Sequence, residues 1–271
     1  MLTLVPTPIG NLEDISKRAL DALLEAELIF CEDTRVTKKL LNLFASKYNL
    51  IFPCTDFKSF HSHNEKQVLK TLNKDDFDKK IVYVSDAGMP CVSDPGASLV
   101  EFAIQNNIKY DVIPGANAVL TAFAMSGFEH TEFTFFGFLA HKGVERKEKL
   151  QKVMNSETLP ILYESPHRLL KLLEELKDID ENRTIFLAKE LTKQYQTTFK
   201  DSSINLYHQL KDTNIRGEWV VIIEPLATSG RNLDINDIQE LDLAPKVKAK
   251  LIAKLTGEKI KDIYQKLLDN N

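Results

Sequence analysis

Short apolar runs alternate with longer amphipathic stretches along most of the chain. Each run is rich in apolar or β-branched residues and is followed by turn-forming residues, which is the pattern of a buried strand. In the first part of the chain the expected strands are residues 3–5, 26–31, 81–84 and 110–113. Residues 14–25 place their apolar side chains on one helical face, with Asp14 as the expected N-cap. Strand, helix and strand in this order predict an α/β sheet with mostly parallel strands.

The alternation continues after Pro114 and Gly115. Helices are expected over residues 118–126, 147–154 and 167–176, and strands over residues 133–139, 161–164, 183–187 and 219–224. Gly127 ends the first of these helices, and Ser165-Pro166 supply an N-cap and a first-turn proline for the third. We therefore predict an α/β protein with two α/β domains, residues 1–115 and 116–226. The cleft between them, near residues 115–117, is the expected ligand site.

The last part of the chain has a different pattern. Residues 227–243 are polar and are expected to form a linker. Residues 244–255 and 258–268 are two basic amphipathic stretches joined at Thr256-Gly257, so residues 244–271 are predicted to form a helical hairpin. Such a hairpin buries little apolar surface alone, and we expect it to pack on the body, a partner subunit or the substrate.

Composition narrows the class of protein. The chain has 271 residues, 43% hydrophobic and 27% charged, which excludes a disordered or coiled-coil chain. No apolar run approaches the roughly 20 residues that cross a bilayer, and the first residues lack the pattern of a signal peptide. We expect a soluble cytoplasmic protein. Cys31, Cys54 and Cys91 show no Cys-x-x-Cys spacing, so neither a disulfide framework nor a metal site is expected.

Charge is unevenly distributed. The 35 basic and 39 acidic residues give a net charge of -4, which argues against binding nucleic acid by bulk attraction. Five basic residues nevertheless lie between Lys142 and Lys152, and seven lysines follow from Lys246 onward. These two patches fit a polyanionic partner. The alternative is a pair of solvated helix faces.

Common motifs for binding nucleotides and zinc are absent from the sequence. It contains no Gly-x-Gly-x-x-Gly, no phosphate-binding loop and no His-Glu-x-x-His. Instead, loops rich in Pro, Gly and Asp follow predicted strands, at residues 6–11, 32–35, 85–90, 93–96 and 114–118. Ligands of parallel sheets bind at the carboxyl ends of the strands, where such loops present rigid backbone groups. S-adenosylmethionine suits a site of this kind.

The same loops carry a resemblance to a known family. The segments are Val5 to Leu12, Glu32 to Arg35, His61 to Glu65, Ser85 to Pro90, Ser93 to Gly96, Glu164 to Arg168 and Glu190 to Lys193. In this order they closely resemble the ribosomal RNA small subunit methyltransferase I family of the tetrapyrrole methylase superfamily. The resemblance implies 2′-O-methylation of a cytidine ribose in 16S ribosomal RNA, with S-adenosylmethionine between two α/β domains. It also implies a homodimer that acts on 16S ribosomal RNA or the small subunit, without a membrane.

The resemblance also implies site residues. The expected cofactor contacts are Pro8, Ile9, Asp86, Ala87, Gly88, Met89, Asn117, Ala118, Tyr163 and Gly217.

Methyl transfer to a ribose hydroxyl needs orientation and a group that takes the proton or stabilises the developing alkoxide. The catalytic candidates are Asp33 with Arg35, His61 or His63, and Glu164 with Arg168. The RNA-binding candidates are Lys142, Arg146, Lys147 and Arg168.

Structural alternatives stay open for the catalytic candidates. Asp33 also fits the cap of a helix that starts near Thr34, and His63-Asn64-Glu65 fits a helix start. Glu164 and Arg168 stand at the spacing of an ion pair. Two other functions also remain, a tetrapyrrole C-methyltransferase of precorrin type and a non-catalytic RNA-binding module.

Overall fold

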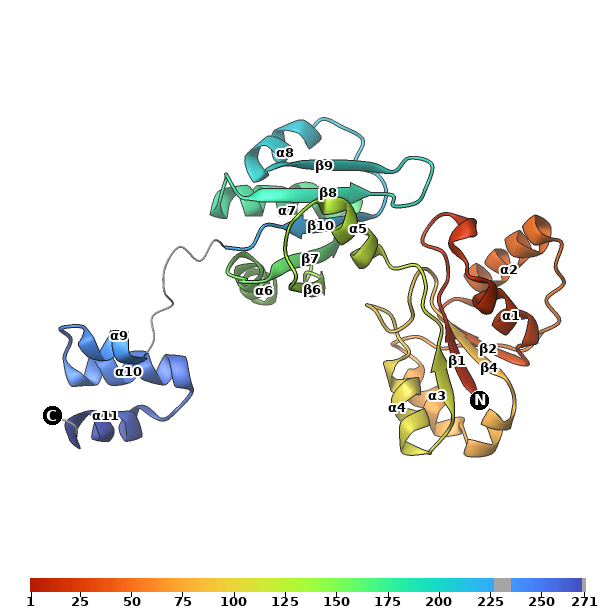
Figure 1. Ribbon diagram of the computed structural model, residues 1–271, viewed down its shortest axis with the longest axis horizontal. Coiled ribbons are helices and arrows are strands. Elements are labelled where there is room, and N and C mark those ends of the chain that lie inside the picture. The colour runs from red at the N-terminus through yellow and green to blue at the C-terminus, as the bar shows by residue number, and fades with distance from the viewer. Residues whose placement is uncertain (227–234, 270–271) are drawn as a thin grey trace. The chain divides into compact units, whose positions relative to one another are not determined.

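The computed structural model describes residues 1–226 and 235–269 (Figure 1). Residues 227–234, which belong to the expected linker, and residues 270–271 lie outside the described residues. The chain divides after Pro225 into a large compact unit and a small one. The large unit contains two five-stranded sheets. The mixed α/β class predicted from the sequence is confirmed.

The first sheet is entirely parallel, in the order β3-β2-β4-β1-β5. Its strands are β1 (Leu2–Val5), β2 (Leu28–Cys31), β3 (Phe57–Ser59), β4 (Ile81–Val84) and β5 (Tyr110–Val112). Its helices are α1 (Lys17–Glu25), α2 (Thr34–Tyr48), α3 (Glu65–Thr71) and α4 (Ala97–Gln105), with short 3-10 turns at Leu12–Asp14 and Lys74–Asp78.

Successive residues of β4 show how this sheet is covered. Ile81 and Tyr83 belong to a core shared with α4, whereas Val82 and Val84 belong to a core shared with α1 and α2. Side chains alternate across a strand, so both faces of the sheet are apolar and both are covered by helices. All strands run the same way, and the loops that follow β1, β2 and β4 therefore meet at one edge.

The second sheet has the order β6-β7-β10-β8-β9. Its strands are β6 (Phe133–Phe138), β7 (Leu159–Glu164), β8 (Thr184–Lys189), β9 (Thr197–Ser202) and β10 (Trp219–Ile223). Only β6 and β7 pair in parallel, and the other neighbours are antiparallel. The expectation of mostly parallel strands is thus right for the first sheet and wrong for the second. The reason is β9, a polar edge strand that returns antiparallel to β8 after a short loop.

Helices cover both faces of the second sheet. The helices are α5 (Ala118–Ser126), α6 (Val144–Met154), α7 (Pro166–Ile179) and α8 (Ser203–Leu210). One face packs on α6, α7 and α8. The other packs on α5, and Ile9 from the loop after β1 joins this second core. That contact links the first loop of the chain to the second sheet.

Helix ends follow the sequence with one correction. Gly127 ends α5 in the left-handed conformation at φ 62°, as predicted. The expected cap of the first helix, Asp14, lies instead in the 3-10 turn, and Ser16 caps α1 by accepting a hydrogen bond from the Ala19 N–H at 3.1 Å. A serine hydroxyl two residues later fits the cap geometry as well as a carboxylate does.

The small unit contains α9 (Ile235–Glu240), α10 (Pro245–Thr256) and α11 (Ile260–Asp269). Ile238, Ala249, Ile252 and Ile263 form its buried core. The hairpin helices lie where the apolar periodicity predicts them, whereas α9 falls inside the stretch expected as a linker. Among the described helices, none combines the length and the apolar character needed to traverse a bilayer.

Candidate active site

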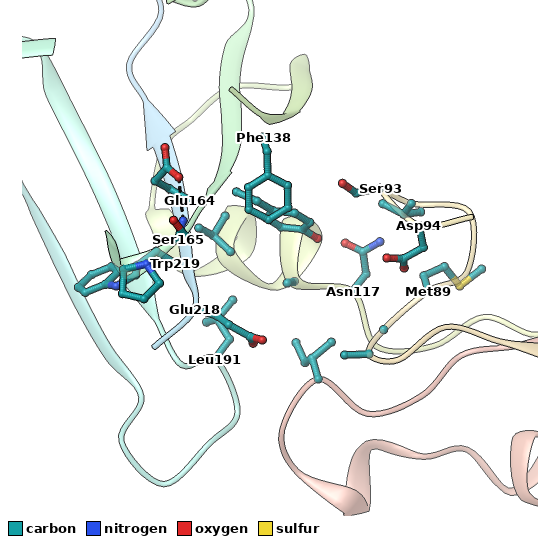
Figure 2. A pocket seen from close by; sticks show the side chains of 18 residues that line it. Met89, Ser93, Asp94, Asn117, Phe138, Glu164, Ser165, Leu191, Glu218 and Trp219 are labelled. Carbon is teal, nitrogen blue, oxygen red and sulfur yellow. Dashed lines mark hydrogen bonds between the residues drawn. The ribbon is translucent and has the colours of Figure 1, made fainter. Parts of the chain in front are cut away.

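A cavity of about 300 Å³ lies at the carboxyl ends of the first sheet's strands and is lined on its other side by residues of the second sheet (Figure 2). It is lined by Ile9, residues 87–89 and 92–94, Asn117, Ala118, Phe138, residues 163–166, Leu191 and residues 218–220. Most of this lining is apolar, with a few polar side chains, as is usual for a small-molecule site.

Most of the expected cofactor contacts line this cavity, namely Ile9, Ala87, Gly88, Met89, Asn117, Ala118 and Tyr163. The other three do not. Pro8, in the loop after β1, is buried and does not line the cavity. The Asp86 carboxylate accepts a hydrogen bond from the Asp33 N–H at 3.2 Å. Gly217 packs against the Glu190 side chain, where a Cβ atom would lie 2.6 Å from Cγ.

Two of the lining loops are joined by backbone hydrogen bonds. The Thr7 N–H donates to the Gly88 carbonyl and the Gly88 N–H donates to the Thr7 carbonyl, each at 3.0 Å. Ser85 adds a hydroxyl donor to the same Gly88 carbonyl. Gly88 has φ +89°, a backbone conformation that residues other than glycine rarely adopt. This bridge fixes the floor of the cavity.

The loop after β1 is also fixed to the second sheet. The Asn11 N–H donates to Thr192 Oγ1 at 3.0 Å, across a large separation in sequence. Gly10 lies so close that a Cβ atom would be 2.6 Å from the same hydroxyl. The loops that carry Ile9 and Leu191 are therefore held together at the cavity wall.

Tyr163 and Asn117 are polar groups in the apolar wall. The Tyr163 ring contacts Phe135 and Phe138 at centroid distances of 4.9 and 5.5 Å, and burial raises the pKa of its hydroxyl to about 12. Tyr163 therefore remains a hydrogen-bond donor at neutral pH. Asn117 caps α5 through Oδ1, which accepts from the Leu120 N–H at 3.1 Å. The amide NH₂ of Asn117 is then the group that it can offer to a ligand.

Three basic side chains hold the segment that follows β6. Lys149 donates to the Phe138 carbonyl, Arg168 to the Leu139 carbonyl and Arg146 to the Ala140 carbonyl, each at 3.0 Å. The Phe138 side chain is 47% exposed at the cavity, and the Arg168 guanidinium lies 5.9 Å from the centroid of its ring. These contacts orient Phe138.

Arg146 is therefore wrongly assigned to an RNA-binding surface. Its side chain is 2% exposed and pairs with the Glu175 carboxylate at 2.6 Å. Arg168 is also largely buried, whereas Lys142 and Lys147 are exposed. The run of basic residues between Lys142 and Lys152 thus combines the buried cation of Arg146 with a smaller exposed patch.

Asp33, Arg35 and His61 do not line the cavity. Asp33 caps α2 by accepting from the Arg35 N–H at 2.8 Å, so the helix-cap interpretation is confirmed. The Arg35 side chain, 89% exposed, pairs with the same carboxylate at 2.7 Å. This hydrogen bonding lowers the pKa of Asp33 to about 2.

The two histidines are joined locally. The His63 N–H donates to His61 Nδ1 at 3.2 Å, and α3 begins at Glu65, which confirms the helix-start interpretation. Within residues 1–226 and 235–269, no group of three or more His, Cys, Asp or Glu side chains could hold a metal ion.

Glu164 lines the cavity with one carboxylate oxygen engaged and the other, Oε2, buried without a hydrogen-bond partner among the described residues. Oε1 lies 2.9 Å from Arg168 Nε and accepts from the Ser165 N–H at 2.8 Å. The ion pair expected from the spacing is confirmed. Ser165 stands at the start of α7 without a capping side-chain bond, because its hydroxyl accepts from Arg168 instead.

The cavity lining also contains Asp94 and Phe138, which the sequence did not predict as contacts. Asp94 belongs to a loop that the sequence indicates as a ligand loop, but nothing in the sequence distinguishes its side chain from those of its neighbours. Phe138 belongs to an aromatic strand whose exposed member cannot be identified before the sheet is built.

Comparison with known proteins agrees with this architecture. Residues 1–205 match the family model described as "Tetrapyrrole (Corrin/Porphyrin) Methylases". In solved structures, the uroporphyrin-III C-methyl transferase of Thermus thermophilus, complexed with S-adenyl homocysteine, has a TM-score of 0.54. It is 13% identical, and the match covers 82% of this chain and 96% of that one, which shows a shared fold.

Curated relatives are much closer in sequence. A protein named "Ribosomal RNA small subunit methyltransferase I" from Campylobacter fetus subsp. fetus is 50% identical over 99% of this chain and 100% of its own length. The protein of the same name from Helicobacter pylori strain J99 is 43% identical over 99% of this chain and 98% of its own. The chain belongs to the ribosomal RNA small subunit methyltransferase I family of the tetrapyrrole methylases.

Proposed function

We propose that this chain transfers a methyl group from S-adenosylmethionine to the 2′-hydroxyl of a cytidine ribose in 16S ribosomal RNA of the small subunit. The observation that carries the proposal is the cavity itself, because most of the expected cofactor contacts line it. Family membership supports the RNA substrate. The neighbouring structure with S-adenyl homocysteine supports a sulfonium donor in this fold.

The cavity residues fit S-adenosylmethionine. Ala87, Gly88 and Ala118 give a wall of small residues, and a Cβ atom at Gly88 would lie 3.2 Å from the Ile9 side chain. Such a wall lets backbone groups approach a nucleoside closely. Ile9, residues 87–89, Asn117, Ala118 and Tyr163 are the residues that would hold the donor. When bound, it supplies a methyl group on a positively charged sulfur.

The rest of the site suits an RNA acceptor. Phe138 offers an exposed aromatic face at the cavity, and bases stack on such faces without a requirement for sequence. Lys142 and Lys147, which follow on the next turn and helix, are exposed cations of the kind that contact phosphates. The protein then has to hold the ribose hydroxyl in line with the methyl group.

We further propose that the two sheets mark two α/β domains, residues 1–115 and 116–226, and that the chain acts as a homodimer in the cytoplasm. The expected boundary at residues 115 and 116 falls between β5 and α5. Sedimentation equilibrium of the purified chain tests the dimer, for which a mass of twice 30.8 kDa is expected. A mass of one chain would contradict it.

The proposed function is tested by a substitution that fills the cavity with a larger side chain. Ala118→Leu should abolish binding of S-adenosylmethionine in calorimetry and methyl transfer to small ribosomal subunits. Ala97→Leu, an exposed position at the start of α4, is the matched control and should leave both unchanged. Transfer to a tetrapyrrole but not to small subunits would favour the C-methyltransferase alternative. Binding of RNA without any transfer would favour the binding module.

A further inference from the structure

Asp94 is presented to the cavity by a tightly fixed loop. The Tyr83 hydroxyl donates to the Pro95 carbonyl, and Gly96, at φ +125°, packs where a Cβ atom would lie 2.4 Å from the Tyr83 ring. Ser93 has φ 69°, which is uncommon for a residue other than glycine. Strained loops of this kind cluster at functional sites. Figure 2 shows the Asp94 carboxylate pointing from this loop toward Asn117.

Three carboxylates line the cavity in the part of the chain that the structure describes, and Asp94 differs from the other two. Glu164 pairs with Arg168 at 2.9 Å, and Glu218 pairs with Lys193 at 2.9 Å. A proton taken up by either would break an ion pair. The charged groups that act on Asp94 are the carboxylates of Glu32 and Asp86, and no cation among the described residues pairs with it. Asp94 can therefore accept a proton without loss of a salt bridge.

The surroundings of Asp94 favour its protonated form. Burial raises its pKa to about 7, and the negative charges of Glu32 and Asp86 add to the increase. The other titratable groups that sense the Asp94 charge are the neutral side chains of Tyr83, Cys91 and Tyr163. A base with a pKa near the operating pH is the most effective in catalysis.

We propose that Asp94 is the general base of the methyl transfer, which rests on the proposed function. The ribose O–H bond breaks and its proton passes to the Asp94 carboxylate. The oxygen's electron pair forms the bond to the methyl carbon, while the bond from carbon to sulfur breaks and its electron pair stays on sulfur. The products are a methylated ribose, a neutral thioether and a protonated Asp94.

The first test is the pH dependence of kcat/KM for methyl transfer to small subunits. The unaltered chain should lose activity below a midpoint near pH 7. Asp94→Asn should reduce the rate about 100-fold or more, the size of a general-base contribution, and should remove this acidic limb. It should bind S-adenosylmethionine as before. The control Asp111→Asn, at a surface carboxylate paired with Arg18, should behave as the unaltered chain.

A second variant keeps the carboxylate and changes its surroundings. Glu32→Gln removes one of the negative charges that raise the pKa of Asp94, so the acidic limb should move to lower pH while activity above the limb is retained. A limb that stays in place in Glu32→Gln, or that persists in an active Asp94→Asn, overturns the inference. Absence of transfer by the unaltered chain at every pH overturns the proposed function as well.

A third measurement needs no turnover. The folded-state pKa of Asp94 lies above its ordinary value of 3.8, so its protonated form stabilises the folded chain at low pH and this contribution is lost as pH rises toward 7. Urea midpoints of the unaltered chain, relative to Asp94→Asn, should fall between about pH 4 and pH 7 and then level off. A difference that does not change with pH contradicts the titration that the inference requires.

Discussion

Phe138 is oriented by its neighbours rather than by its own burial. Its ring lies beside Tyr163 and Arg168, and its carbonyl accepts from Lys149, while the ring itself remains exposed. An aromatic side chain held in this way can receive a base without a cost in side-chain ordering. If the proposed function holds, a base of the RNA is expected to stack on the Phe138 ring.

Phe138→Ala should raise the KM for small subunits about tenfold, because stacking of one base contributes about 1–3 kcal/mol. The affinity for S-adenosylmethionine should change little. Steady-state kinetics with both substrates varied separates the two effects. Tyr195→Ala, at a 74% exposed ring outside the cavity, is the control. An unchanged KM in Phe138→Ala would remove the stacking role.

Two substitutions of Asp33 distinguish its role as a helix cap from the role of its negative charge. Asn accepts the same backbone hydrogen bond as Asp, so Asp33→Asn should retain the melting temperature of the protein and Asp33→Ala should lower it. Thermal unfolding followed by circular dichroism measures both. Asp33→Asn should also retain methyl transfer, because Asp33 lies outside the cavity. Loss of methyl transfer in Asp33→Asn would show that the Asp33 carboxylate contributes to the reaction.

Individual residues also show what the sequence can predict. The loops at residues 6–11, 85–90 and 114–118 were predictable as ligand loops because they are turns that follow strands, and parallel strands bring such turns together. The individual contacts Ile9, residues 87–89 and Asn117 followed from the family resemblance. Arg146 was not, because its partner Glu175 lies on another helix 29 residues away and their contact depends on how α6 packs on α7. Charge along a sequence does not reveal which charges are buried.

Helix α6 combines a structural cation with exposed ones. Arg146 is buried, pairs with Glu175 on α7 and holds the Ala140 carbonyl, whereas Lys147 on the next position is exposed. The same helix therefore stabilises the body through one face and is available to a polyanion through the other.

Arg146→Met should lower the free energy of unfolding by about 3 kcal/mol, because it removes the cation that lies 2.6 Å from the Glu175 carboxylate and leaves only the more distant Lys171 at 4.0 Å. The double variant Arg146→Met with Glu175→Leu should recover part of this loss. Urea unfolding measures the change. Equal stability of Arg146→Met and the unaltered chain would contradict the buried ion pair.

The exposed lysines beside Arg146 should behave differently. Replacing Lys142 and Lys147 with Gln should leave the free energy of unfolding unchanged and reduce the salt dependence of RNA binding.

The two sheets differ in how far their elements were predictable. The inner strands of the first sheet, β1, β2 and β4, are largely buried and consist mostly of apolar residues, so the sequence predicts them clearly. β9 has the sequence Thr-Thr-Phe-Lys-Asp-Ser and lies at the edge of the second sheet, with most of its residues exposed. A polar edge strand lacks the apolar pattern from which strands are predicted.

The whole chain combines a large unit that contains the cavity with a small helical unit. The small unit is rich in lysine, and Lys250, Lys254 and Lys261 are exposed on α10 and α11. A chain with a net charge of -4 can bind RNA only through such local patches. If the proposed function holds, these lysines are expected to add to RNA binding.

Replacing Lys250, Lys254 and Lys261 with Gln should weaken binding of small subunits and lower the salt slope of the affinity by about 2. The matched control removes three exposed lysines from the large unit, Lys70, Lys74 and Lys109. Both variants change net charge equally, so a reduced slope in the first alone locates the RNA contact. Equal slopes in the two variants would show that the small unit makes no such contact.

The most direct test is the identity of the methylated nucleoside. Small subunits from cells that lack this gene are incubated with the purified chain and S-adenosylmethionine carrying a deuterated methyl group, and the 16S ribosomal RNA is then digested and analysed by mass spectrometry. One new labelled nucleoside, 2′-O-methylcytidine, is expected with the unaltered chain and should be absent with Ala118→Leu. A label on a base, a label on another nucleoside, or no label would contradict the proposed function.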